Sequence, residues 1–367
     1  LTDSVSEKRN VFIEIAKAKY VISIEANDHV SISKTDHFKK DVSFYKTLIK
    51  RKHPGLVLFS SGSTGDSKAA VHDLEYILEK FKLKKRSYTS ITFLLYDHIG
   101  GVNTMLYILS NGGCIVTAEN RTPDSILRLI ETYNVELLPT SPTFLNLIIL
   151  SEAYENYKLD SLKVITYGTE PMPENTLLKI NSLFPQIKLQ QTYGLSEVGI
   201  LRSKSKDSNS LWVKIGGEGF ETRVRNGLLE IKAKSAMLGY LNASSPFTND
   251  GWFKTGDEVD VDGDYFLIKG RKSEIINVGG EKVYPQEVEN IILGLDYVQD
   301  VLVYGESHPI VGSIVVAEVY FKDEDKTIHY KKDLKKYCNT HLENYKVPAK
   351  IKVMEKLKFS KRFKKKR

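Results

Sequence analysis

Cysteine is scarce in this sequence. Only Cys114 and Cys338 occur among 367 residues, and they lie far apart. This spacing provides neither a disulfide framework nor a Cys-x-x-Cys pair for a metal or for redox chemistry. We therefore expect a protein of a reducing compartment, the cytoplasm.

Long hydrophobic runs are also missing. The first ten residues, LTDSVSEKRN, are charged and lack the apolar centre of a signal peptide. The most apolar stretch, residues 91–109, is interrupted by Asp97, His98 and two glycines. The sequence therefore predicts neither secretion nor a membrane span.

The positive charge is concentrated at one end of the chain. Six of the last seven residues, KRFKKKR, are basic, whereas the whole chain has a net charge of only +7. Such a run is usually a solvated surface segment. No RNP-like aromatics or helix-turn-helix spacing accompany it, so a nucleic-acid-binding protein is the weaker alternative and we expect no nucleic-acid partner.

Strand-length apolar runs alternate with helical patterns from residue 56 to about residue 193. We expect strands at 56–59, 91–96, 114–118, 135–139, 163–167 and 188–192. The helices expected between them are 74–81, 103–109, 123–133, 143–151 and 174–184. This alternation is typical of an α/β fold with a mostly parallel, helix-covered sheet that binds ligands at the carboxyl ends of its strands.

Two other patterns follow along the chain. After about residue 205, Asn226-Gly227 and Asp262-Gly263 predict antiparallel hairpins. From residue 270 onwards we expect a small α+β domain, with helices at 286–293 and 330–342 and strands at 298–304, 313–321 and 349–353. We therefore divide the chain into residues 1–269 and 270–367, with a short hinge near Ser273.

The strongest local signal is LVLFSSGSTGDSKAAVH, residues 56–72, where a buried strand leads into a loop of hydroxyls and glycines. Glycines let backbone N–H groups approach an anion, hydroxyls add donors and Lys68 adds charge, so the loop predicts a phosphate site. It is not a Walker loop, because Gly62 and Gly65 are three apart and Ala69 follows the lysine. The alternative is a flexible Ser/Gly surface loop.

Three motifs in order then carry a family resemblance. SSGSTGDSK resembles the [ST]SG[ST]TGxPK signature of the acyl- and aryl-adenylate-forming (AMP-binding) superfamily, with Ser67 in place of the usual proline. This superfamily includes acyl-CoA synthetases, peptide synthetase adenylation domains and luciferases. QTYGLSEVG (191–199) resembles its YGxTE motif, and residues 252–289 resemble its TGD and GRxxxxIxxxGxxVxPxEVE motifs. The resemblance implies a large N-terminal AMP-binding domain and a small mobile C-terminal domain.

The resemblance also implies a nucleotide site. Tyr193 would stack on adenine, Ser196 would contact the α-phosphate, Glu197 would hold Mg²⁺, and Asp257 would bind the ribose hydroxyls. These residue types suit those roles, although each could instead be an ordinary turn or surface residue. The full expected nucleotide-binding set is Ser60, Ser61, Gly62, Ser63, Thr64, Gly65, Lys68, Gly168, Thr169, Glu170, Thr192, Tyr193, Gly194, Ser196, Asp257 and Arg271.

Two further segments bear on the acyl pocket and on the catalytic lysine. LLYDHIGGVNTML (94–106) resembles the FHxGG segment of acyl-CoA synthetases, which places His98 beside an acyl pocket. A helix cap is the alternative for His98, and Asp97 lies near the place where amino-acid-activating relatives carry an aspartate. The tail LKFSKRFKKKR resembles LPxTxxGKxxR, which makes Lys364 the catalytic lysine and puts Phe363 in place of the glycine. Shifted alignments would choose Lys361, Lys365 or Lys366.

The resemblance implies an ATP-dependent acid ligase, with ATP and Mg²⁺ as cofactors. It would activate a carboxylic acid as an acyl-adenylate and then transfer it to a pantetheine thiol, of coenzyme A or an acyl carrier protein, along a channel at Gly279 and Gly280. The alternatives are an amino-acid-activating enzyme and an inactive nucleotide-binding member or fragment. Only 55 residues precede the phosphate loop, so we expect the first part of the N-terminal domain to be missing.

Overall fold

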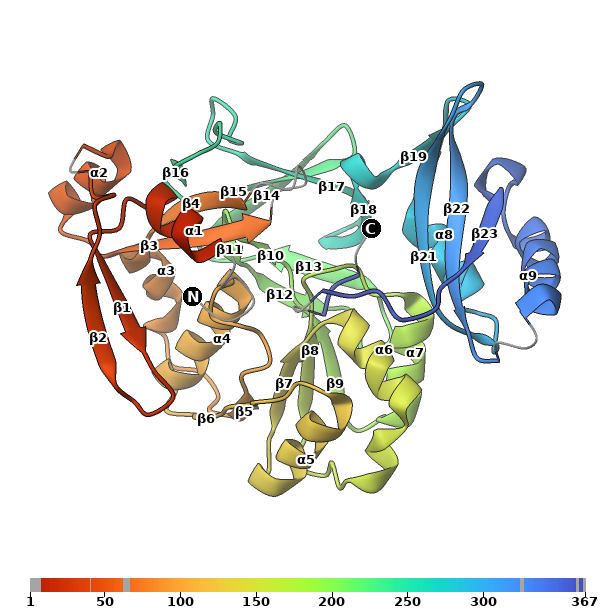
Figure 1. Ribbon diagram of the computed structural model, residues 1–367, viewed down its shortest axis with the longest axis horizontal. Helices are drawn as coiled ribbons and strands as arrows, with labels where there is room; N and C mark the ends of the chain where they lie inside the picture. Colours follow the sequence, from red (N-terminus) through yellow and green to blue (C-terminus); the bar gives the residue numbers. More distant parts are fainter. Residues whose placement is uncertain (1–7, 40, 62–66, 324–326, 361–362, 366–367) are drawn as a thin grey trace.

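The computed structural model describes residues 8–39, 41–61, 67–323, 327–360 and 363–365. A large N-terminal part stands beside a smaller C-terminal part, and the last residues of the chain return towards the large part (Figure 1). Among the residues described, no helix combines the length and the apolar character that crossing a membrane requires.

A parallel sheet lies in the centre of the large part. Its strand order is β6-β5-β7-β8-β9, and every neighbouring pair is parallel. The strands are β5 (Thr89–Ile91), β6 (Cys114–Val116), β7 (Leu137–Thr140), β8 (Val164–Tyr167) and β9 (Lys188–Gln191). The expected alternation is confirmed here, although the strand expected at 91–96 was wrong beyond Ile91, because the chain turns towards a helix start at His98.

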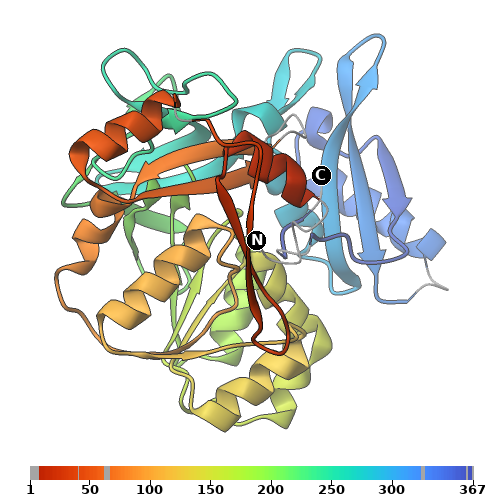
Figure 2. The same cartoon turned by 60° about the vertical axis from the view of Figure 1, so that its left-hand side comes forward.

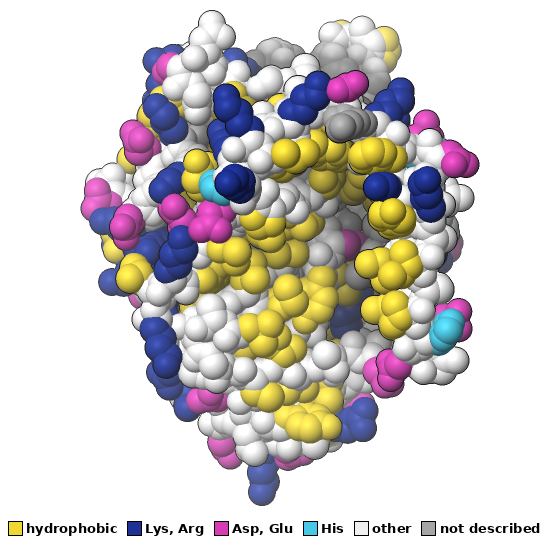
Figure 3. Space-filling view, turned by 90° about the vertical axis from the view of Figure 1, so that its left-hand side faces the viewer, with side chains coloured by type: hydrophobic (Ala, Val, Ile, Leu, Met, Phe, Trp, Pro, Cys, Tyr) yellow, Lys and Arg dark blue, Asp and Glu magenta, His cyan; other side chains and the backbone are white. Residues whose placement is uncertain are grey.

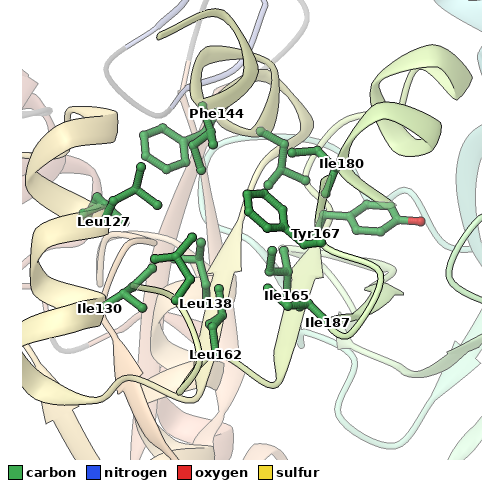
Figure 4. Close-up of a cluster of buried hydrophobic side chains, with 14 of the residues drawn as sticks. Leu127, Ile130, Leu138, Phe144, Leu162, Ile165, Tyr167, Ile180 and Ile187 are labelled. Atoms are coloured by element: carbon green, nitrogen blue, oxygen red, sulfur yellow. The ribbon is translucent and has the colours of Figure 1, made fainter. Parts of the chain in front are cut away.

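Three helices pack on one face of this sheet and form its core with it (Figure 4). They are α5 (Pro123–Tyr133), α6 (Pro142–Ser151) and α7 (Glu174–Leu183). The side chains of Thr122 and Ser141 accept hydrogen bonds from the first turns of α5 and α6, and a proline follows each of them. These capping signals explain why the sequence places both helices within one residue.

The first expected strand lies elsewhere. β3 (Gly55–Ser61) pairs antiparallel with β4 (Ser67–Asp73), and β16 (Gly239–Tyr240) completes this three-stranded sheet. The sequence analysis missed β4 and assigned residues 56–59 to the parallel sheet. Only residues 62–66 separate the two strands, and so short a connection joins antiparallel strands, whereas a parallel pair needs a crossover of a dozen or more residues.

The two glycine turns form hairpins within a six-stranded antiparallel sheet, as predicted. Asn226 and Gly227 both have left-handed φ values, of 52° and 75°, as a two-residue hairpin loop requires. The strand order is β12-β13-β18-β17-β15-β14. The strands are β12 (Arg202–Ser205), β13 (Trp212–Gly216), β14 (Phe220–Arg225), β15 (Leu228–Ala233), β17 (Phe253–Asp262) and β18 (Tyr265–Arg271), with short β10 (Gly194–Leu195) and β11 (Gly199–Ile200) nearby.

The small C-terminal part has a core of its own, drawn from residues 276–351. Strand β23 adds in parallel to β22 at one side of its sheet. Its elements are β19 (Ile276–Val278), β20 (Glu281–Val283), α8 (Pro285–Ile292), β21 (Val298–His308), β22 (Gly312–Phe321), α9 (Thr327–His341) and β23 (Lys350–Val353). Each of the expected helices and strands is present.

The N-terminal segment contains a hairpin that the sequence analysis did not anticipate. In Figure 2 it comes forward across the large part, and Figure 3 shows hydrophobic side chains gathered on this face. Ile22 pairs with Ile32 and Ile24 with Val30, and all four are exposed. The elements of this segment are α1 (Arg9–Ile15), β1 (Tyr20–Ile24), β2 (Val30–Lys34) and α2 (Ser43–Arg51). Two further helices of the large part, α3 (Leu74–Leu78) and α4 (Ile99–Ser110), follow later in the chain.

Two adjacent glycines in α4 provide a matched test of packing. A Cβ added to Gly101 would lie 2.1 Å from the carbonyl oxygen of Leu95, whereas one added to Gly100 would meet only side-chain atoms, at 3.2 Å and beyond. We expect Gly101→Ala to lower the free energy of unfolding by about 2 kcal/mol or more. Gly100→Ala should change it by less than about 1 kcal/mol. Urea unfolding measures both, and equal effects would contradict the packing.

Strand β4 buries His72 completely, and this predicts a pH dependence of stability. Burial lowers the pKa of His72 from 6.5 to about 4, against smaller opposing effects of the backbone at Ser196 and Ser235. The unfolded chain therefore binds the proton more readily between these values, so stability is complete above pH 6.5 and falls as the pH drops towards 4. The shift corresponds to a loss on the order of 3 kcal/mol.

The measurement is the free energy of unfolding of the wild type and of His72→Gln between pH 7.5 and 4. The wild type should lose about 3 kcal/mol more than the variant over this range. The variant His341→Gln serves as the control, because His341 is exposed. Its free energy of unfolding should depend on pH as that of the wild type does. Superimposable pH profiles for wild type and His72→Gln would refute the prediction.

Candidate active site

A cleft of about 1570 Å³ extends from the amino to the carboxyl ends of the central parallel strands and reaches the small C-terminal part. It collects most of the expected site residues from segments far apart in the sequence. Those lining it are Ser60, Lys68, His98, Gly168, Thr169, Glu170, Thr192, Tyr193, Gly194, Ser196, Glu197, Asp257, Arg271, Ser273 and Lys364. The expected Gly62, Ser63, Thr64 and Gly65 lie outside the described residues, and Ser61 is the last residue of β3.

At one wall of the cleft, Tyr240 lies close to both the lysine of the phosphate loop and the expected metal ligand, Glu197. Lys68 lies opposite Ser60 in the β3–β4 pair, and its Nζ is 5.6 Å from the ring centroid of Tyr240. The Tyr240 hydroxyl donates a hydrogen bond to Glu197. Burial, followed by the charge of Glu197, raises the pKa of Tyr240, so the phenol stays protonated and remains a donor.

The sequence analysis missed Tyr240, although GLLEIKAKSAMLGYLN, which contains it, resembles a framework motif of the same superfamily. Only the pairing of β16 with β4 brings this residue to Glu197. The described residues contain no group of three or more His, Cys, Asp or Glu side chains that could hold a metal. Mg²⁺ commonly uses one or two protein carboxylates together with substrate phosphates and water, so the single carboxylate of Glu197 fits it.

A second cluster lies where β17 and β18 pair. The Tyr193 hydroxyl donates a hydrogen bond to Asp257, and the Nε of Arg271 lies 3.5 Å from the other carboxylate oxygen of Asp257. Burial raises the pKa of Asp257, and the tyrosine and the arginine oppose this shift. A buried carboxylate with such neighbours is suited to accepting hydrogen bonds from ligand hydroxyls.

Two glycines of the expected nucleotide-binding set are tightly packed. A Cβ added to Gly168 would lie 2.5 Å from Oγ1 of Thr192, and one added to Gly194 would lie 2.8 Å from the carbonyl oxygen of Gly199. Thr169 has φ of 74°, a left-handed value that is rare for a side chain branched at Cβ. Such strain occurs most often at binding and catalytic sites.

Glu170 holds the C-terminal tail. One of its carboxylate oxygens accepts a hydrogen bond from the backbone N–H of Thr143 (2.8 Å), and the other accepts one from the backbone N–H of Lys365 (3.0 Å). The Nζ of Lys365 in turn donates to the carbonyl of Val301 and forms a 3.0 Å ion pair with Asp300 in the small part. The tail is thus bound to both parts of the molecule.

Phe363 anchors the tail one residue earlier. Its ring centroid lies 5.2 Å from those of Phe93 and Phe144, and Arg121 lies 5.3 Å above the ring. Ser141 donates a hydrogen bond of 2.6 Å to its carbonyl oxygen. Phe363 has φ of 51°, a left-handed conformation that suits the glycine of the family motif at this position.

Between these two anchors, Lys364 borders the cleft. Lys365, which a shifted alignment of the tail motif would make the catalytic lysine, is committed to Asp300 and Val301. Lys361 and Lys366, which further shifts of the motif would choose, lie outside the described residues. Lys364 and Lys365 both line the cleft, and the choice of Lys364 as the catalytic lysine stays a prediction from the tail motif.

His98 caps a helix and also borders the cleft. Its Nδ1 accepts a hydrogen bond from the backbone N–H of Gly100 (3.1 Å), which caps α4, and the residue also lines the cleft. The neighbouring Asp97 is not among the residues that line it. The charge of Asp97 instead acts on Arg121, where it opposes the lowering of the arginine's pKa by burial.

The remaining expected residues lie at the junction of the two parts. Ser273 belongs to a single 3₁₀ turn, η4 (Lys272–Glu274), that follows β18 directly. Gly279 and Gly280 form the turn between β19 and β20, with left-handed φ values of 62° and 96°. In this arrangement Lys364 borders the cleft, whereas the Gly279-Gly280 turn is not part of its lining.

Comparisons with known proteins agree with this geometry. A family model described as AMP-binding enzyme matches residues 4–220, and one described as AMP-binding enzyme C-terminal domain matches residues 287–364. The indoleacetate–CoA ligase of Aromatoleum aromaticum is 28% identical over 299 residues, which are 72% of this chain and 57% of that enzyme. The 2-succinylbenzoate–CoA ligase of Staphylococcus epidermidis is 25% identical over 342 residues, 88% of this chain and 70% of that enzyme.

A solved structure shows the same fold. The anthranilate CoA ligase AuaEII in complex with anthranoyl-AMP superposes with a TM-score of 0.71 at 20% identity, over 82% of this chain and 63% of that chain. The chain thus spans between 57% and 70% of the length of these three proteins. Because the first family model alone covers more than half of it, the chain belongs to the AMP-binding enzyme family.

Proposed function

We propose that this chain carries the catalytic machinery of an ATP-dependent acid–thiol ligase. It would convert a carboxylic acid to an acyl-adenylate, release pyrophosphate, and pass the acyl group to a pantetheine thiol. The observation that supports this most directly is the convergence of Lys68, Glu197 and Lys364 on one cleft, from three distant segments. The buried Asp257 and the exposed Arg271 border the same cleft.

In the first half-reaction, an oxygen of the substrate carboxylate attacks the α-phosphorus of ATP, and the bond to pyrophosphate breaks. Negative charge develops on the phosphoryl oxygens, and the ammonium of Lys364 offsets it. Asp257 accepts hydrogen bonds from the ribose and fixes the position of the nucleotide. Glu197, oriented by the Tyr240 hydroxyl, would hold Mg²⁺, which supplies further positive charge at the phosphates when it is bound.

In the second half-reaction, the thiol attacks the acyl carbon and AMP leaves. We place the domain boundary between residues 269 and 270, with Ser273 as the hinge. Support comes from the small part's separate core, which begins at Ile276. A rotation there would withdraw Lys364 and bring the Gly279-Gly280 turn to the cleft, where backbone without side chains leaves room for a pantetheine arm.

An acid without an α-ammonium group suits this cleft better than an amino acid. His98 lines it, whereas Asp97 does not and instead interacts electrostatically with Arg121. The two relatives named above are coenzyme A ligases of carboxylic acids. We therefore favour coenzyme A as the thiol and keep an acyl carrier protein as the second candidate.

The ribose site can be tested by binding alone. Asp257→Ala should lower the affinity for ATP by about ten- to a hundredfold, because it removes a charged acceptor worth about 1.5 to 3 kcal/mol. Isothermal titration calorimetry measures this directly. Asp260→Ala, on the same strand but paired with Lys269 at the surface, is the matched control. Equal ATP affinity in wild type and Asp257→Ala would exclude the proposed ribose contact.

The catalytic lysine is tested by ATP–pyrophosphate exchange with a panel of carboxylic acids. Lys364→Ala should reduce exchange by about a hundredfold or more. Thioester formation from a supplied acyl-adenylate should persist, because the proposed rotation withdraws Lys364 from the cleft before the second half-reaction.

Lys361→Ala and Lys366→Ala are the controls for the alignment, and both should retain exchange. If either of them loses exchange while Lys364→Ala retains it, the assignment of Lys364 is wrong. Exchange that no carboxylic acid supports would instead refute the proposed activity.

A further inference from the structure

The cleft has a second, basic arm. Lys80 at η2 (Glu79–Phe81), Lys85 in the following loop and Arg202 at the start of β12 all line it. None of the three belongs to the nucleotide site described above. They come from two segments that are distant in sequence, so their convergence is a property of the fold.

Lys80 and Arg202 are half-buried, whereas Lys85 is exposed. The Nζ of Lys80 donates a hydrogen bond of 2.8 Å to the carbonyl oxygen of Ile200. Burial lowers its pKa to about 7, and the positive charges of Lys85 and Arg202 contribute to this shift. The Nζ of Lys80 also lies 5.1 Å from the ring centroid of Phe81. A partly buried ammonium beside other cations is stabilised when an anion binds to it.

The acidic side chains nearest in sequence are engaged elsewhere. Glu79 pairs with Lys234 at 2.8 Å, and Glu75 pairs with Lys82 at 3.1 Å. Glu218 approaches Arg202 only to 3.7 Å, and its side chain is 78% exposed. Among the described residues, Arg202 thus has this long, exposed ion pair, and neither Lys80 nor Lys85 forms one.

The basic arm is continuous with the expected acyl end of the cleft. Helix α4 begins at the cap residue His98 and packs against both η2 and β11. Thr104 and Tyr107, one and two turns into this helix, line the same cleft. Ile200, whose carbonyl holds Lys80, follows Glu197 by three residues. A molecule held at His98 can therefore extend along α4 towards Lys80.

We propose that Lys80, Lys85 and Arg202 bind a second anionic group on the acid that the cleft activates, so that the substrate class is dicarboxylic or similarly dianionic acids. This inference rests on the proposed function and adds a substrate class to it. A carboxylate at this position would form charge-assisted hydrogen bonds with the lysine and the arginine and would compensate the cluster. One carboxylate would then react while the other fixes the orientation.

The test compares α,ω-dicarboxylic acids of four to eight carbons with monocarboxylic acids of equal length in ATP–pyrophosphate exchange. The wild type should prefer a dicarboxylic acid by at least about tenfold in kcat/KM, the size of one charge-assisted contact. Lys80→Met and Arg202→Met should each reduce this preference by about tenfold or more. Lys84→Met, an exposed neighbour that does not line the cleft, should keep it.

Two results would overturn the inference while leaving the proposed function intact. One is equal use of both acid series, with the same ratio in Lys80→Met as in the wild type. The other is an effect of Lys80→Met on the KM for coenzyme A but not for dephospho-coenzyme A, because the cluster would then bind the phosphate of the thiol substrate.

A binding measurement separates this inference from the proposed activity. If no acid supports exchange, the proposed function fails, and calorimetry with the dicarboxylic acids then decides the inference. Binding that is lost in both Lys80→Met and Arg202→Met, and kept in Lys84→Met, supports the site. Absent binding, or equal binding in all variants, excludes it.

Discussion

A largely buried lysine in the tail links the two parts of the molecule. Lys365 pairs with Asp300 of the small part, while its backbone N–H is held by Glu170 of the large part. A buried charge that loses one partner costs about 3 to 5 kcal/mol, so these three residues favour a single relative position of the two parts. Hydrogen bonds of Asn146 with Gln299 and of Asn175 with Asn290 join the two parts as well.

The packing of the tail also explains how Phe363, whose backbone is strained, can lie next to Lys364. Phe363 adopts a left-handed φ that costs on the order of 1 kcal/mol or more for a side chain of this kind. Its ring packs against Phe93 and Phe144, and the burial and aromatic contacts offset that strain. Lys364 is therefore presented by anchored neighbours, although it follows a position where the family motif has glycine. The proposed rotation of the small part has to release both anchors together.

Local signals made much of the fold predictable, but long-range pairing did not follow from them. The caps Thr122 and Ser141 and the Asn226-Gly227 turn act within a few residues, so the helices and hairpins that they define were found from sequence. Strand β4 was missed because its antiparallel pairing with β3 is a tertiary contact that the local sequence signals do not specify. The site followed the motifs, but the hydrogen bond of Tyr240 to Glu197 and the attachment of Glu170 to the tail arise only in the folded chain.

The charged groups that line the cleft bear on which end of the proposed substrate reacts. Asp257 and Glu197, the carboxylates that suit a ribose and a metal, line the same cleft as Lys80, and η2, which carries Lys80, contacts helix α4, which begins after His98. A dianionic acid has two groups able to attack ATP, and an evenly charged cleft would not distinguish them. Because a carboxylate bound at Lys80 is held by charge-assisted hydrogen bonds, the other one is directed towards the nucleotide. The same cations would then contribute both to selecting the substrate and to choosing which of its ends reacts.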